Sequence, residues 1–253
     1  VKINELCSYS NEKIAIEKLN LLNYISTENM LPNKNGITKA SSLPNTGKAT
    51  KFHRGDILVS NIRPYFKKIW FANKDGGSSN DVLVFKNSNP NQVDNKYLYY
   101  NFVDDKFFNY VVAGSKGTKM PRGDKEAILN YEIYKPPLDV QQKIASILSA
   151  LDDKIELNNR MNKVLEQMAQ AIFKQWFVDF EFPNENGEPY KSSGGEMEWC
   201  EELGKEIPKG WRVGTLGEVI VNYDSKRIPL SKNEREKRKK IYPYYGAASI
   251  ADY

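Results

Sequence analysis

The sequence is poor in the residues that build disulfide frameworks, metal sites and histidine-based catalysis. Only two of its 253 residues are cysteines and one is a histidine. Cys7 and Cys200 lie far apart and form neither a framework nor a metal-binding spacing. With His53 alone, most metal sites and every histidine-based nucleophile relay are excluded. We expect no membrane span and no signal peptide, and a reducing, cytoplasmic setting fits best.

Motifs for nucleotide binding and catalysis are also missing. No Gly-rich loop precedes Lys-Ser or Lys-Thr, as nucleoside triphosphate binding would require. The chain lacks the Asn-Pro-Pro-aromatic and Asp-Pro-Pro-Tyr tetrapeptides of amino-methyltransferases. The Gly-rich stretch 113–117 has no preceding strand or following helix to bind S-adenosylmethionine, and the spaced carboxylates and lysine of a metal-dependent nuclease are absent. The sequence predicts no catalytic or metal-binding residue.

The net charge of +5 is unevenly distributed. Residues 1–135 carry +7 and residues 209–253 carry +5, whereas 136–183 carry −2 and 184–208 carry −5. Two basic regions therefore flank an acidic middle, a pattern that favours a polyanionic partner, most often nucleic acid. Solvated lysines on an ordinary surface explain the charge alone equally well.

One long helix is predicted from Pro136 to Phe177. No Gly or Pro falls between Leu138 and Phe182, and apolar residues recur at helical spacing. Asp139 is a candidate N-cap, with Gln142 three residues on as a capping box requires. Such a rod, roughly 60 Å long, more plausibly spaces domains or seats partners than fills a core. We divide the chain into a first domain (1–135), this helix (136–183), an acidic linker or loop (184–208) and the start of a second domain (209–253).

The first domain has the pattern of a mixed α/β fold. Alternating and apolar runs predict strands at 56–60, 68–72, 82–85 and 128–134, a helix at 97–112 and a polar loop at 114–127. The whole chain is thus predicted to be α+β: a mixed domain, a long coiled-coil-type helix, and the opening of another domain.

Two basic segments of the first domain are candidate DNA-binding elements. The first combines polar base-reading groups with lysines and an aromatic ring, at Ser60, Asn61, Arg63, Tyr65, Lys67 and Lys68. Arg63 suits a guanine edge and Asn61 suits adenine, while the lysines suit phosphates. The second lies in the Gly-rich loop, at Lys116, Thr118, Lys119, Arg122 and Lys125. An exposed turn and a flexible loop that contact nothing are the alternatives.

The apolar stripe of the long helix is the candidate partner-binding surface. Its members are Gln142, Ile144, Leu148, Leu151, Ile155, Leu165, Met168, Ile172 and Trp176. Such a stripe is often core. Here Lys154, Asn158 and Gln175 interrupt a heptad-like seam, which favours a paired helix because polar seam residues fix register.

At PPLDVQQKIASILSALDDKIELNNRMN the chain resembles the specificity subunit of Type I restriction–modification systems. The matching features are Pro136–Leu138, Gln142, Ile144–Ala145 and Leu151–Ile155. The resemblance extends to GDILVSNIRPYF, KGTKMPRGDKEAI, GTLGEVI and IYPYYGAASIADY, the last two like the opening of a second recognition domain.

The resemblance implies a non-catalytic subunit that binds double-stranded DNA. Two target recognition domains would each read half of a split site, and long antiparallel helices would set their spacing and dock methyltransferase subunits. S-adenosylmethionine, ATP and magnesium would then belong to partner subunits, including a restriction and translocation subunit. The second domain is cut short, a second long helix is absent, and the first residue is Val1 rather than Met. We therefore expect either a fragment or a half-subunit that dimerises.

Two other functions remain open from the residues alone. A coiled-coil interaction protein could bind acidic proteins through its basic regions. A self-sufficient nuclease would need catalytic residues that the chain lacks.

Overall fold

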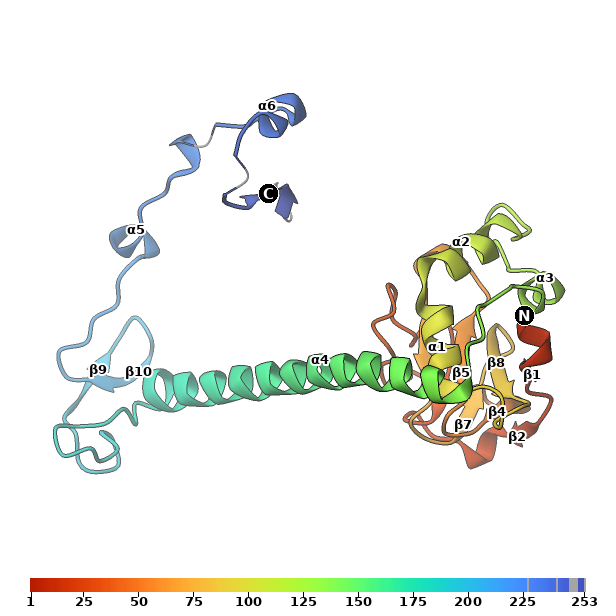
Figure 1. Cartoon of the computed structure of the whole chain (residues 1–253). Coiled ribbons are helices and arrows are strands. Elements are labelled where there is room, and N and C mark those ends of the chain that lie inside the picture. Colours follow the sequence, from red (N-terminus) through yellow and green to blue (C-terminus); the bar gives the residue numbers. More distant parts are fainter. Residues whose placement is uncertain (227, 240, 246–249, 253) are drawn as a thin grey trace. The chain divides into compact units, whose positions relative to one another are not determined.

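The computed structural model describes residues 1–226, 228–239, 241–245 and 250–252. The chain divides into two compact units, Val1–Lys163 and Val164–Tyr253, and the boundary falls inside the long helix α4 (Leu138–Phe173), which is uninterrupted (Figure 1). None of the described helices is long and apolar enough to cross a membrane.

The first unit contains two four-stranded sheets. One has the order β1 (Cys7–Tyr9), β8 (Val82–Asn87), β5 (Ile57–Ser60) and β6 (Ile69–Phe71), all antiparallel. The other has the order β2 (Lys13–Ala15), β4 (Lys48–Phe52), β7 (Gly76–Ser78) and β3 (Tyr24–Ile25), with β3 parallel to β7. Three 3-10 turns lie between strands: η1 (Ile3–Glu5), η2 (Ile16–Lys18) and η3 (Pro64–Phe66). The strands predicted at 56–60, 68–72 and 82–85 are confirmed as β5, β6 and β8.

Strand β5 is buried on both faces. Ile57 and Val59 pack in a core with phenylalanines of helices α1 (Asn95–Val103) and α2 (Asp105–Ala113). Leu58 packs in a second core with Phe52 and Trp70. Successive strand residues face opposite sides, so a continuous apolar run is the pattern of a strand covered on both faces. The end of β5, where the first basic segment begins, is therefore held firmly.

The prediction of one helix at 97–112 was wrong in its continuity. The structure has α1 and α2 instead, separated at Asp104, whose carboxylate accepts a hydrogen bond from the Lys106 amide. Aspartate competes with the helical backbone by bonding nearby amides, which makes it a better cap than an interior residue. The cap turns α2 so that Phe107 stacks on Phe102 of α1.

The prediction of a strand at 128–134 was also wrong. Helix α3 (Lys125–Leu129) occupies its beginning, with Asp124 accepting from the amides of Glu126 and Ala127. The rest is extended but makes only an isolated bridge, between Lys2 and Glu132. The N-cap preceding the apolar run, rather than the run itself, decided the local structure.

The long helix starts one residue before the predicted cap. Helix α4 begins at Leu138, and the Pro137 carbonyl accepts from the amides of Val140 and Gln141. Asp139 therefore lies in the first turn rather than at the N-cap, and Gln142 is exposed and forms no capping box. Thirty-six residues span about 54 Å. A π-helical turn, η4 (Lys174–Val178), follows.

The second unit has a hairpin where a linker was predicted. Within 184–208, strands β9 (Met197–Cys200) and β10 (Lys205–Pro208) pair antiparallel, so the prediction of a loop was wrong for this part. The ring of Trp211 stacks on that of Phe182, with centroids 5.5 Å apart. Aromatic pairing thus fixes a segment that lacks regular periodicity.

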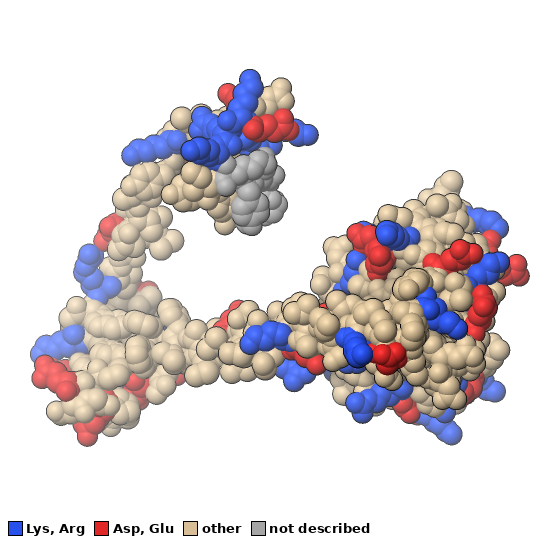
Figure 2. All heavy atoms as spheres, viewed as in Figure 1, with Lys and Arg blue, Asp and Glu red and all other residues tan. Residues whose placement is uncertain are grey.

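The described part of 209–253 is mostly exposed. It contains α5 (Leu216–Val219), η5 (Asp224–Lys226), α6 (Lys232–Glu236), β11 (Tyr244–Tyr245) and β12 (Ile250–Asp252). Lys and Arg side chains gather around α6 (Figure 2). The predicted second domain stays a prediction, and its residues 227, 240, 246–249 and 253 lie outside the described residues.

Candidate DNA-binding site

The structure brings the two predicted basic segments together. Ile62 and Arg122 form an antiparallel bridge. The Arg63 amide donates to the Pro121 carbonyl at 2.8 Å, and the Gly123 amide donates to the Asn61 carbonyl at 3.2 Å. Residues 60–68 and 114–125, the paired loops, therefore form one surface although some 60 positions separate them in the sequence.

Two residues of the first loop have left-handed backbone conformations. Arg63 (φ 48°) precedes η3 and Lys67 (φ 51°) follows it. For residues with a Cβ this conformation costs about 1–3 kcal/mol, and surrounding contacts must maintain it. The bond from Arg63 to Pro121 does so on one side, and a bond from the Lys34 amide to the Lys67 carbonyl does so on the other. The turn is thus held in a shape that it would not adopt alone.

Gly123 permits the close approach of the two loops. A Cβ at this position would lie 2.8 Å from Asn61 Oδ1 and 2.9 Å from side-chain carbons of Ile128 and Val111. Because these neighbours are packed in the core, no side chain fits there. Sequence reasoning did not identify Gly123; the only signal was a glycine between charged residues in a loop.

Ser60 and Asn61 lie inside the domain. Their exposed fractions are 2% and 6%. Ser60 Oγ donates to the Ile62 carbonyl at 3.0 Å, and Asn61 Oδ1 is buried without a hydrogen-bond partner among the described residues. Both side chains therefore support the loop from within.

Several predicted phosphate ligands are engaged within the domain. Lys67 pairs with Asp105 at 3.1 Å, Lys116 with Asp124 at 2.8 Å, and Arg122 with Asp81 at 3.1 Å. Lys68 Nζ donates to the Thr27 carbonyl, and burial lowers its pKa. On the face in Figure 2, basic and acidic side chains of the first unit are correspondingly interspersed.

The remaining predicted residues are open to solvent. Thr118, Lys119 and Lys125 are exposed, and neither lysine has an ion pair among the described residues. Tyr65 is 49% exposed, and its ring lies 4.7 Å from that of Phe66. Arg63 is half-buried, with Nε buried and unpartnered in the described part of the chain. These side chains could bind a polyanion without first breaking an ion pair.

The predicted partner-binding stripe on α4 is largely exposed. Ile144, Leu151, Ile155, Leu165, Met168, Ile172 and Trp176 are between 37% and 59% exposed, Leu148 is half-buried and Gln142 is exposed. The buried glutamine at the start of the helix is Gln141, which sequence reasoning did not identify.

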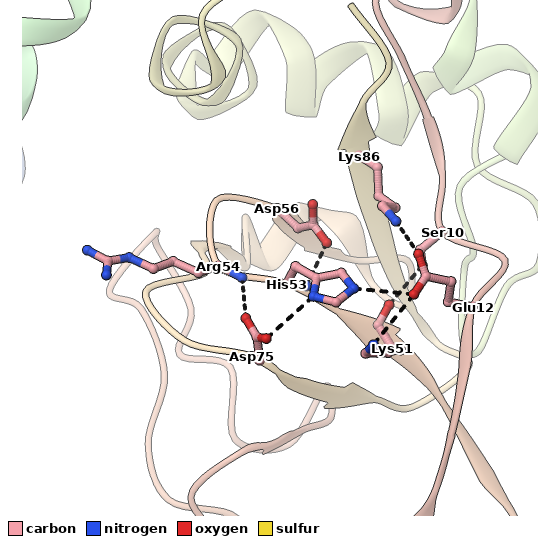
Figure 3. Close-up of polar contacts among 8 residues, drawn as sticks. All are labelled: Ser10, Glu12, Lys51, His53, Arg54, Asp56, Asp75 and Lys86. Carbon is pink, nitrogen blue, oxygen red and sulfur yellow. Dashed lines mark hydrogen bonds and ion pairs between the residues drawn. The ribbon is translucent and has the colours of Figure 1, made fainter. Parts of the chain in front are cut away.

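The single histidine lies in a separate ionic cluster at the end of β4. His53 Nε2 lies 3.2 Å from Glu12 Oε2, and Nδ1 lies 3.4 Å from Asp75 Oδ2 (Figure 3). Lys86 also contacts Glu12. Hydrogen bonds from Lys86 and then His53 lower the pKa of Glu12 to about 2. A hydrogen bond from the Arg54 amide is the main cause that lowers the pKa of Asp75, and a hydrogen bond from His53 lowers this pKa further.

This cluster links side chains at the ends of β2, β4 and β7 to Lys86 of β8. Ser10 Oγ is already donating to the Lys51 carbonyl. Both ring nitrogens of His53 face carboxylates, and no group of three potential metal ligands occurs among the described residues.

Comparisons with known proteins identify a matching family. A profile of the family described as Type I restriction modification DNA specificity domain matches residues 1–167. The Type I restriction enzyme MjaIX specificity subunit of Methanocaldococcus jannaschii is 39% identical over 137 residues, covering 54% of this chain and 30% of that protein. The Type I restriction enzyme HindI specificity subunit of Haemophilus influenzae is 34% identical over 166 residues, covering 62% and 36%. The chain spans about a third of the length of these relatives.

A solved structure shares the fold. The S subunit of a Type-I restriction-modification system from M. genitalium has a TM-score of 0.54 and 18% identity, covering 71% of this chain and 46% of that one. The predicted fold class, mixed helix and sheet with a long helix, is confirmed.

The ionic cluster predicts a pH-dependent stability. Because the folded pKa of Glu12 is about 2 against a usual 4.5, its stabilising contribution is complete above pH 4.5 and is lost as the pH falls from 4.5 towards 2. Glu12→Gln should flatten this part of the stability curve, measured by denaturant unfolding across pH. Glu17→Gln, at an exposed residue without an ion pair among the described residues, is the control. Identical curves for Glu12→Gln and wild type would contradict the assignment.

Proposed function

This chain belongs to the family of Type I restriction modification DNA specificity domains, and we propose that it recognises a DNA sequence and directs the enzymes of a Type I restriction–modification complex to it. Partner subunits would methylate adenine at N6 and carry out ATP-dependent cleavage. The chain itself would supply no catalytic group. A coiled-coil protein that binds acidic proteins does not account for the family membership.

The observation that carries the proposal is the joining of the two basic segments. A DNA-recognition surface needs groups that position the backbone and groups that read bases, both presented on a rigid scaffold. The paired loops combine exposed lysines, an exposed tyrosine and a half-buried arginine. Backbone hydrogen bonds tie them to one another.

We assign roles according to exposure and pairing. Arg63 would read a base edge, with Tyr65 packing beside it. Thr118, Lys119 and Lys125 would contact phosphates directly. Three basic side chains would give up their aspartate partners to bind phosphates: Lys67, Lys116 and Arg122. The remaining three residues would stabilise the shape of the loops: Ser60, Asn61 and Lys68.

The exposed stripe of α4 would seat the methyltransferase subunit. A run of apolar side chains about half exposed over most of a 36-residue helix is unfavourable in water and typical of a surface that another chain covers. The cofactors, S-adenosylmethionine, ATP and magnesium, would bind to partner subunits. The proposed activity would take place in the cytoplasm, where the DNA target would lie.

A first test measures how DNA binding depends on salt. Each phosphate contact releases counterions and contributes about −0.9 to the slope of log K against log salt. Lys119→Ala, in the full chain with its methyltransferase subunit, should reduce that slope by about 1. Lys18→Ala, at an exposed lysine of η2, is the matched control. If the wild-type complex gives no gel shift on random duplexes at low salt, the proposed function fails.

A second test concerns base recognition. Arg63→Ala should lower discrimination at one base pair by about 1–3 kcal/mol, because a bidentate arginine contact is lost. The measurement is selection from a randomised duplex library, with Arg54→Ala as a control at an exposed arginine outside the paired loops. An unchanged preference at every position would rule out Arg63 as a base reader.

A third test concerns docking on α4. Ile155→Glu places a carboxylate in the exposed stripe and should abolish co-purification with the methyltransferase subunit, since its burial would be costly. Gln167→Glu introduces the same charge about a third of a turn around the helix. Equal recovery of the subunit with both variants would contradict this docking surface.

A further inference from the structure

Helix α4 is attached to the recognition domain through few contacts. Of its 36 residues, only Gln141 and Ala145 are buried. Ala145 packs into the core that α1 and α2 share with the sheet. Such a small contact area leaves the direction of a long helix to a small number of directional interactions.

Gln141 makes the first of these interactions. Its side chain is fully buried. Oε1 accepts from the Asp94 amide at 3.0 Å, and Nε2 donates to the carbonyls of Gln92 at 3.0 Å and Pro136 at 2.8 Å. Because the amide satisfies one donor and two acceptors that are held by separate segments, only one side-chain orientation fits. A glutamate here would place a carboxylate against two carbonyl oxygens.

The second interaction lies three turns further along the helix. Tyr100 Oη of α1 donates to Asp152 Oδ2 at 2.7 Å. The Tyr100 ring packs on Tyr99, with centroids 5.2 Å apart, and Tyr99 packs on Phe71 of β6. The helix rises about 16 Å over the eleven steps from Gln141 to Asp152.

Beside this second contact the helix does not pack tightly on the domain. A cleft of about 350 Å³ lies there, lined by β6, α1 and the part of α4 from Ser149 to Glu156. Side chains of the domain therefore do not fill the space beside this stretch of helix. The hydrogen bond between Tyr100 and Asp152 links it to α1.

We propose that Gln141 and Tyr100 are positioning residues that together fix the direction in which α4 leaves the recognition domain. A rod held at one point can pivot, whereas a rod held at two points about 16 Å apart cannot. Neither residue belongs to the paired loops or to the exposed stripe. Their effect is on where the stripe lies relative to the paired loops.

The functional consequence rests on the proposed function. A pivot of about 10° at Gln141 moves the far end of α4, some 48 Å away, by about 8 Å. This displacement corresponds to roughly two base pairs at about 3.4 Å each. A complex that reads two half-sites at a fixed separation would lose that selectivity if the helix could pivot.

The test measures the direction of the helix without DNA. In the full chain with Cys200→Ser, nitroxide labels at Lys18→Cys and Lys163→Cys report the distance between domain and helix by pulsed electron paramagnetic resonance; Cys7 is buried and stays unlabelled. Gln141→Met and Tyr100→Phe should each broaden or shift the distance distribution. The double variant should do so most.

Neighbouring residues supply matched controls. Gln142→Met makes the same change at an exposed glutamine, and Tyr99→Phe removes a hydroxyl that makes no hydrogen bond within the described part of the chain. Both should leave the distribution unchanged. Tyr100→Phe alters one hydrogen bond at the surface, so it keeps the test decisive even if Gln141→Met unfolds. An unchanged distribution in a folded Tyr100→Phe variant would overturn two-point positioning.

A functional readout separates this inference from the proposed function. In the assembled complex, the double variant should methylate duplexes whose half-site separation differs by one or two base pairs, which wild type rejects. A wild-type complex that ignores DNA while the distances behave as expected would reject the proposed function and keep the positioning role. If the variants leave the distances unchanged while the wild-type complex methylates DNA normally, the positioning role is rejected and the proposed function is kept.

Discussion

The burial of β5 on both faces is the constraint on which the candidate site depends. Its side chains enter two cores, so the strand can neither slide nor rotate without exposing apolar surface. The first basic loop starts where this strand ends. The second loop leaves from α2 and returns through α3, and Phe108, Val111 and Ile128 of these helices are buried in one of the same cores. Because both loops are anchored to one core, they lie close together. Weak backbone hydrogen bonds then suffice to join them.

The charges of the paired loops follow from this arrangement. Lys67, Lys116 and Arg122 each lie beside an aspartate, at or near the surface. Ion pairs in such positions contribute only about 0–1 kcal/mol, because water and salt screen them. Exchanging an aspartate for a phosphate therefore costs little. In the proposed site, the aspartates would keep the free domain from presenting an unscreened positive surface, while Lys119 and Lys125 would stay available for a first encounter with a polyanion.

The long helix combines a specific attachment with an unspecific surface. At its start, the buried amide of Gln141 makes three hydrogen bonds that require one geometry. Further along, the side chains are apolar and exposed, and such contacts fix partners by area rather than by direction. In the proposed roles, orientation would depend on one part of the helix and association on another.

The sequence was enough to identify the long helix, three strands of the first sheet and the family to which the chain belongs. These follow from local periodicity, from the absence of glycine and proline, and from motifs that are contiguous in the chain. It could not determine that 128–134 is no strand, because a cap at Asp124 outweighed the apolar run. It did not identify Gln141 as a buried residue, because the groups that bind its side chain belong to Gln92, Asp94 and Pro136. Three further features depend on the packing of the folded chain: Asn61 is buried, Gly123 allows the loops to touch, and particular basic residues already have carboxylate partners. Each of these depends on residues tens of positions away in the sequence, and packing brings such residues together where no local pattern records it.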